Sequence, residues 1–90
     1  MAVIKITTEN FESEVIRSDV PVLLDFYADW CGPCRMMAPV MEEIAAERSD
    51  IKVCKINVDE EKELARQNKG MGIPTLMVVR DGKIETRTTG

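Results

Sequence analysis

Short apolar segments separated by polar ones predict a chain in which strands alternate with helices. The segment 22–28 (VLLDFYA) is apolar on both alternating faces except for one aspartate. This pattern is typical of a central strand that is covered on both sides, as in a parallel sheet. Including this one, the predicted strands span residues 3–7, 22–28, 52–58, 75–80 and 83–89.

Three segments between these strands have helical patterns. Thr8 is expected to cap a first helix that extends to about Arg17. The second helix has apolar residues at i, i+3, i+4, i+7 and i+8, and Pro39 within it is expected to produce a kink. Asp59 is expected to cap a third, acidic helix that ends at Gly70.

The predicted order of elements is therefore β-α-β-α-β-α-β-β. Strands that alternate with helices imply a mostly parallel sheet, and Asp81-Gly82 predicts a hairpin that adds an antiparallel edge. We expect an α/β fold with a mixed central sheet flanked by helices. Ninety residues suit one small domain, which we place at residues 1–90.

Charge and composition argue against several classes of function. The chain has 12 basic and 16 acidic residues, a net charge of −4, and only 4% aromatic residues. Nucleic-acid binding requires a basic surface or stacking aromatics, and an anionic membrane surface also requires basic residues. The N-terminal segment has no long apolar core followed by a cleavage site, so we expect a cytoplasmic protein.

The chain contains three cysteines and no histidine. An odd number argues against a framework of structural disulfides, and in a reducing compartment a close cysteine pair is more often catalytic or metal-binding. Zinc normally needs four ligands, more than this chain offers, so a metal bridging two copies is the remaining metal alternative. Cys54 lies in an apolar strand, where we expect it to pack as a small hydrophobic residue.

The other two cysteines lie in the segment 29–35 (DWCGPCR), between a predicted strand and a predicted helix. Cys31 is expected at the start of the helix, where unpaired N–H groups and the helix dipole stabilise a thiolate. Cys34 follows one turn later, close enough to form a disulfide with it. Pro33 suits the first turn, and Gly32 leaves the approach to Cys31 open. The segment predicts a reversible redox pair.

Asp25 is the only charged residue in its strand and precedes Cys31 by six positions. Burial raises the pKa of a carboxyl group, so a buried Asp25 could accept a proton from Cys34 directly or through one water. Lys55 on the next strand is the expected charge partner. The alternative is that Asp25 marks only a bend or an edge of the strand.

The segment 71–75 (MGIPT) is a third candidate part of the site. Pro74 can open a strand, and Gly72 permits a close approach of the backbone. If the segment lies beside the cysteines, main-chain groups of Gly72 and Ile73 could pair with an extended peptide. The alternative is a purely structural turn.

Taken together, FYADWCGPCRMMAP, KINVDE and GIPTLMVVRDG resemble the thioredoxin family over essentially the whole chain. The resemblance implies a thiol–disulfide oxidoreductase that reduces disulfides in protein substrates. Cys31 would be the attacking thiolate that forms a mixed disulfide, and Cys34 would resolve it. Asp25 would be the family's buried carboxylate, Lys55 its lysine neighbour, and Pro74 its cis-proline facing the disulfide.

The resemblance also implies partners and a docking surface. Electrons would come from NADPH through a flavoprotein, thioredoxin reductase, and the chain itself would carry no cofactor beyond its redox-active disulfide. The expected substrate-binding residues are Trp30, Gly32, Pro33, Gly72, Ile73, Pro74 and Gly90. Gly-Pro between the cysteines resembles the reducing branch of the fold. A disulfide oxidase or isomerase and a thioredoxin-like binding module remain as alternatives.

Two departures from the family pattern stand out. Tyr27 occupies a position where the family usually has tryptophan, and we expect a conservative change in packing. The sequence stops at Gly90, where the family normally continues into a final helix that covers one face of the sheet. Without that helix, we expect lowered stability and self-association through the bare face.

Overall fold

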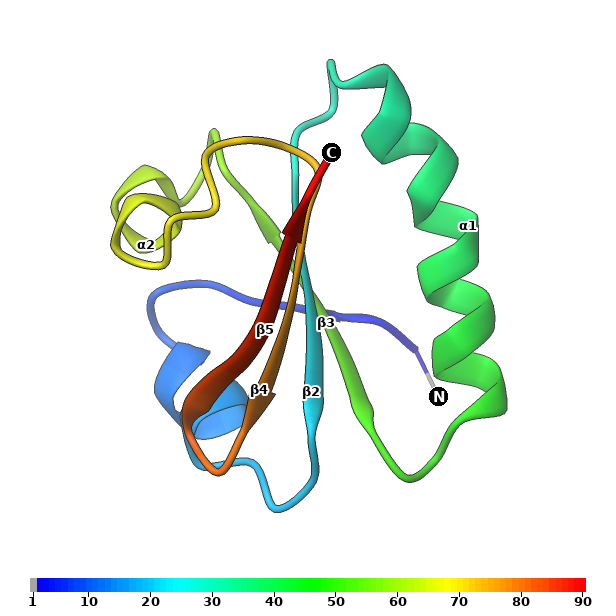
Figure 1. Ribbon diagram of the computed structural model, residues 1–90, viewed down its shortest axis with the longest axis vertical. Helices are drawn as coiled ribbons and strands as arrows, with labels where there is room; N and C mark the ends of the chain where they lie inside the picture. Colours follow the sequence, from blue (N-terminus) through cyan, green and yellow to red (C-terminus); the bar gives the residue numbers. More distant parts are fainter. Residues whose placement is uncertain (1) are drawn as a thin grey trace.

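The computed structural model describes residues 2–90 as a five-stranded mixed sheet with the strand order β1-β3-β2-β4-β5 (Figure 1). Strands β1, β3 and β2 are parallel, whereas β4 and β5 are antiparallel to their neighbours. The strands are β1 (Ile4–Lys5), β2 (Val22–Tyr27), β3 (Lys52–Asn57), β4 (Thr75–Arg80) and β5 (Lys83–Thr89). The helices are the π-helix η1 (Glu12–Ile16), α1 (Gly32–Glu47) and α2 (Lys62–Gln67). The predicted α/β class and order of elements are confirmed.

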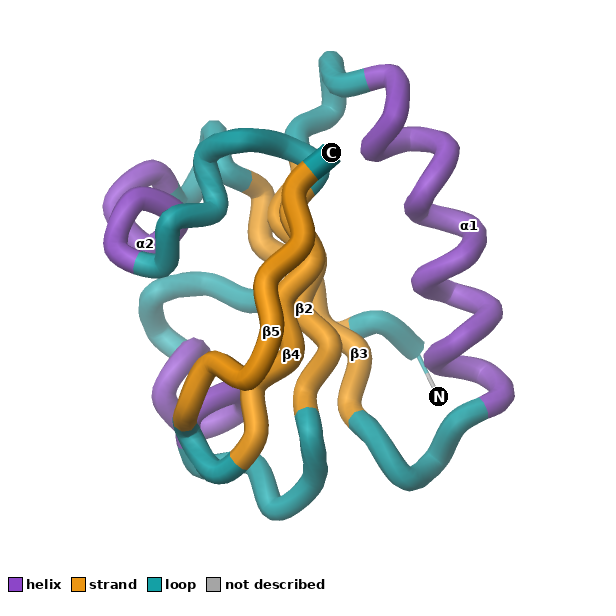
Figure 2. The backbone as a smooth tube through the Cα atoms, in the orientation of Figure 1, coloured by secondary structure: helices purple, strands orange, loops and turns teal. Residues whose placement is uncertain are grey.

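Helices cover both faces of the sheet. Helix α1 lies over one face, while η1 and α2 lie over the other (Figures 1 and 2). On the η1 and α2 side, Leu24 and Phe26 of β2 are fully buried in the larger core cluster. On the α1 side, Met41 and Ala45 pack with Val53 in a smaller cluster. Strand β2 is therefore covered on both faces, as its continuous apolar sequence predicts.

The first helix is shorter than predicted. It spans Glu12–Ile16 rather than residues 8–17, and the Arg17 N–H donates to the Glu12 carbonyl in the wide i→i+5 pattern. Thr8 does not cap it, because its hydroxyl donates instead to Glu61 Oε1 at 2.7 Å. The Thr8 hydroxyl, which was predicted to cap the helix, is therefore bonded to a residue 53 positions away in the sequence.

The third helix also begins later than predicted. Asn57 Oδ1 accepts the N–H groups of Asp59 and Glu60, so the backbone makes a turn here before α2 begins at Lys62. The prediction that Asp59 caps this helix is wrong. The structure gives its carboxylate another partner, Trp30.

The C-terminal end of α2 has a Schellman geometry in which the left-handed residue is Lys69, with φ 58°. The N–H of Gly70 donates to the Ala65 carbonyl at 2.8 Å. Gly70 was predicted to stop the helix, but it is glycine for a different reason: a Cβ at this position would collide with the Phe26 ring.

The remaining local predictions concern α1 and the hairpin. Helix α1 continues through Pro39 without ending. Asp81 and Gly82 both have positive φ, as the two-residue turn between β4 and β5 requires, so the predicted hairpin is confirmed. Within residues 2–90 no helix is both long and apolar enough to cross a membrane.

Candidate redox site

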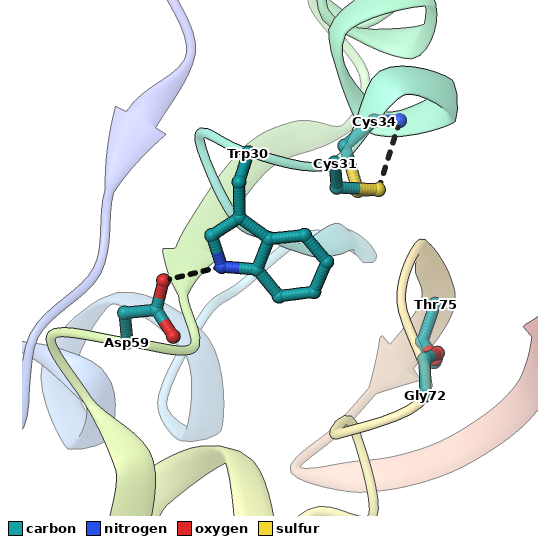
Figure 3. The surroundings of a disulfide bond; sticks show 6 residues. All are labelled: Trp30, Cys31, Cys34, Asp59, Gly72 and Thr75. Atoms are coloured by element: carbon teal, nitrogen blue, oxygen red, sulfur yellow. Dashed lines mark hydrogen bonds between the residues drawn. A yellow bond between two sulfur atoms is a disulfide. The ribbon is translucent and has the colours of Figure 1, made fainter.

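The cysteine pair lies where β2 ends and α1 begins, at the carboxyl edge of the parallel strands (Figure 3). Cys31 is the N-cap of α1, and Pro33 occupies the first turn. Cys31 and Cys34 form a disulfide, with their Cα atoms 5.2 Å apart. The Cys34 N–H donates to Cys31 Sγ at 3.2 Å. This donor and the positive end of the helix dipole would both stabilise a thiolate on Cys31 in the reduced protein.

Both sulfur-bearing residues are largely buried, with Cys31 6% and Cys34 3% exposed. No atom lies within 4 Å of a Cβ built at Gly32. The space beside the intervening glycine is therefore open, as the sequence predicts.

Asp25 lies inside the protein on β2, only 4% exposed. Its Oδ1 has no hydrogen-bond partner among the described residues. Burial raises the pKa of this carboxyl group from 3.8 to about 6, and the positive charge of Lys55 opposes part of the increase. A pKa near neutral suits a group that exchanges a proton during a reaction.

Lys55 is directly opposite Asp25 in the register of β2 and β3. Its Nζ lies over the Tyr27 ring, 5.7 Å from the centroid, close enough for a cation–π interaction. Tyr27 therefore offers an aromatic face to this lysine.

A small cavity of about 50 Å³ joins these groups. Asp25, Cys34 and Lys55 all line it. This volume can hold a water molecule, which needs about 10–15 Å³. Cys34 and Asp25 therefore border one cavity that is large enough for a water molecule.

A loop between α2 and β4 faces the disulfide from the other side (Figure 3). The Ile73–Pro74 peptide bond is cis. Thr75, fully buried, donates its hydroxyl hydrogen to the Gly72 carbonyl. The Gly90 N–H donates to the Pro74 carbonyl at 3.0 Å, which brings the end of β5 to the same loop.

Comparison with known proteins decides the family. A family model described as Thioredoxin matches residues 2–90. Thioredoxin of Pseudomonas aeruginosa is 43% identical over 89 residues, which cover 98% of this chain and 82% of the relative. Thioredoxin of Mycobacterium tuberculosis is 49% identical over 90 residues, covering 99% and 78%. Thioredoxin of Thiocapsa roseopersicina is 48% identical over 85 residues, covering 93% of each.

The chain belongs to the thioredoxin family. Family membership and the Cys31–Cys34 pair together support a thiol–disulfide oxidoreductase of the protein-disulfide reductase type. No observation in the structure favours the binding-module or oxidase alternatives.

Trp30 is the most exposed aromatic side chain near the disulfide of this thioredoxin-family chain, at 69%. Its indole N–H donates to Asp59 Oδ2 at 2.8 Å (Figure 3). Asp59 was predicted to cap a helix, and its contact with Trp30 was not predicted. Its position after β3, at the edge where the strands end, was the available signal.

Cys54 is separate from the site. It is a free thiol on β3, fully buried, and burial raises its pKa to about 12. The prediction that it packs as a small hydrophobic residue is confirmed. Over residues 2–90 no group of three or more His, Cys, Asp or Glu side chains is placed to hold a metal ion.

Proposed function

We propose that this chain reduces disulfides in protein substrates with Cys31 as the attacking thiolate and Cys34 as the resolving thiol. The observation that carries the assignment is the hydrogen bond from the Cys34 N–H to Cys31 Sγ at the first turn of α1. This donor serves only one of the two sulfurs. It therefore stabilises negative charge on Cys31, so Cys31 is the nucleophile.

The reaction transfers two electrons to the substrate. The Cys31 thiolate attacks one sulfur of the substrate disulfide, and the other substrate sulfur leaves as a thiolate. Cys34 then attacks Cys31 Sγ, which releases the second substrate thiol and forms the Cys31–Cys34 disulfide. The proton of Cys34 passes to Asp25 through the cavity that both residues line, and Lys55 limits how far the pKa of Asp25 rises.

The substrate would dock on exposed and main-chain groups around the disulfide. Trp30 offers an exposed ring held by Asp59, and Gly32 leaves open space beside the sulfurs. An extended peptide would pair with main-chain groups of the loop opposite. The docking surface that we propose consists of Trp30, Gly32, Pro33, Gly72, Ile73, Pro74 and Gly90.

Regeneration requires an external supply of electrons. We propose that thioredoxin reductase, a flavoprotein, passes electrons from NADPH to the Cys31–Cys34 disulfide. We further propose that residues 1–90 work as one unit in the cytoplasm.

Insulin reduction by this chain with dithiothreitol tests the assignment. The wild-type chain is expected to accelerate insulin precipitation. In a separate reaction of the pre-reduced protein with insulin, with dithiothreitol removed, Cys34→Ser is expected to accumulate a mixed disulfide on non-reducing gels, because nothing resolves the Cys31 adduct. Cys31→Ser is expected to form no such adduct, and Cys54→Ala serves as the matched control with wild-type behaviour. An inactive wild-type chain, or an adduct that forms on Cys34 instead, would contradict the assignment.

We propose in addition that two copies of the chain associate through the sheet face beside α1. Leu23, Ile51 and Val78 line a groove of about 520 Å³ on this face. Leu23 and Ile51 pack against the core while remaining partly exposed. Apolar surface of this kind is stabilised when a second surface covers it.

A further inference from the structure

The loop that faces the disulfide has no regular secondary structure at residues 70–74, so specific contacts must set its shape. Gly70 at its start is packed against the Phe26 ring. The other contacts of the loop come from two neighbouring strands: Thr75 begins β4, and Thr89 ends β5. These two threonines are direct partners in the register of the β4–β5 ladder.

The direction of the hydrogen bonds between them follows from the number of hydrogens. Thr75 has one hydroxyl hydrogen and donates it to the Gly72 carbonyl, which has no hydrogen of its own. Thr75 Oγ1 and Thr89 Oγ1 lie 3.3 Å apart. Because the only hydrogen of Thr75 is already committed, Thr89 is the donor in this pair. The chain of donors therefore runs from Thr89 to Thr75 to the carbonyl of Gly72.

Two further contacts connect the end of β5 to the same loop. A Cβ built at Gly72 would lie 3.3 Å from Thr89 Cγ2, so the methyl group of Thr89 is packed against this glycine. The next residue, Gly90, donates its N–H to the Pro74 carbonyl at 3.0 Å. Thr89 and Gly90 thus contact the loop on both sides of Ile73.

We infer that Thr89 is a positioning residue: its hydroxyl orients Thr75 and thereby fixes the loop on which a substrate peptide docks. This inference rests on the proposed function, because it assigns Thr89 to the docking loop of that same site. Thr89 touches neither cysteine in this chain of contacts. It therefore affects the recognition of a polypeptide substrate and leaves the intrinsic reactivity of Cys31 unchanged.

Thr89→Val tests the inference because valine keeps the shape and the strand preference of threonine and removes only the hydroxyl. The side chain is exposed on an edge strand, so the variant is expected to fold. The second-order rate constant of the reduced protein with insulin should fall about fivefold, the factor that one neutral hydrogen bond is worth. The rate constant with 5,5′-dithiobis(2-nitrobenzoate), which is too small to span the docking loop, should stay unchanged.

Two variants are the controls. Thr89→Ser restores the hydroxyl and should reduce insulin at the wild-type rate. Thr88→Val makes the same chemical change one residue earlier, on the opposite side of β5, and should have no effect. The inference is overturned if Thr89→Val reduces insulin as fast as wild type, if it slows both substrates equally, or if Thr89→Ser is as slow as Thr89→Val.

Amide hydrogen exchange provides a readout that does not depend on activity. The Gly90 N–H, bonded to Pro74, should exchange severalfold faster in Thr89→Val than in wild type or Thr89→Ser. Unchanged exchange would overturn the inference even if the rates differ. A wild-type chain that reduces neither substrate would instead refute the proposed function. In that case, faster Gly90 exchange in Thr89→Val would still show that the Thr89 hydroxyl holds the loop in the wild-type chain.

Discussion

Asp25 is buried, and one of its carboxylate oxygens has no hydrogen-bond partner within residues 2–90, so the stability of the protein depends on pH in an unusual way. In the folded state burial raises the pKa from 3.8 to about 6. Between these values the unfolded chain has released the proton and the folded chain retains it, so the free energy of unfolding falls as the pH rises. Below about pH 4 Asp25 is protonated in both the folded and the unfolded state, and its burial no longer lowers the free energy of unfolding through ionisation.

Asp25→Asn is therefore expected to raise the free energy of unfolding of the oxidised protein at pH 7 by about 3 kcal/mol, which corresponds to the pKa difference of about two units. At pH 3.5 the same substitution should change the free energy of unfolding little. Urea denaturation at the two pH values measures both quantities. Asp29→Asn, an exposed change in the turn after the same strand, is the control and should alter neither value by more than about 0.5 kcal/mol. An equal gain for Asp25→Asn at both pH values would show that packing, rather than ionisation, is responsible.

The end of helix α2 places two neighbouring residues under opposite constraints. Lys69 adopts positive φ, which is strained for a residue with a Cβ, whereas Gly70 has no room for a Cβ beside Phe26. We expect Lys69→Gly to raise the free energy of unfolding by about 1 kcal/mol. We expect Gly70→Ala to lower it by about 3 kcal/mol, because the buried ring must move. Thermal and urea denaturation measure both changes. If Gly70 were the left-handed residue, as the sequence suggested, Lys69→Gly would destabilise the helix instead.

This pair shows what a single sequence reveals about an element and what it does not. The strands and their order along the chain were predictable, because apolar runs and the Asp81-Gly82 turn are local signals. The ends of the helices were not, since partners distant in sequence set them: Thr8 donates to Glu61, and Asp59 accepts from Trp30.

The same distinction applies to the candidate site. The motif that brings Cys31 and Cys34 together is visible in the sequence, which also suggested Lys55 as a partner of Asp25. The β2–β3 register, which places Lys55 opposite Asp25, is known only from the structure. The contact between Thr75 and Thr89 was missed, because it depends on how two strands align across a hairpin with a register shift after Val78.

At the scale of the whole molecule, the two faces of the sheet are covered to different extents. On the η1 and α2 side, Leu24, Phe26 and Met77 are fully buried. On the α1 side, Leu23, Leu76 and Val78 remain partly exposed. Three charged residues also line the groove on this second face: Arg48 and Asp50, which form an ion pair, and Arg80, which pairs with Glu85 outside the lining. Apolar and charged side chains together are the usual composition of a protein–protein interface.

If two copies meet on this face, Val78→Lys should weaken the dimer, because it places a charge among the apolar residues that line the groove. Sedimentation equilibrium is expected to show a concentration-dependent monomer–dimer equilibrium for the wild-type chain and a shift toward monomer for Val78→Lys. Lys83→Glu, an exposed charge change on the same hairpin but outside the groove lining, is the control and should leave the equilibrium unchanged. A wild-type chain that remains monomeric at millimolar concentration would refute the association, while leaving the assignment of Cys31 and Cys34 untouched, because those residues do not line this groove.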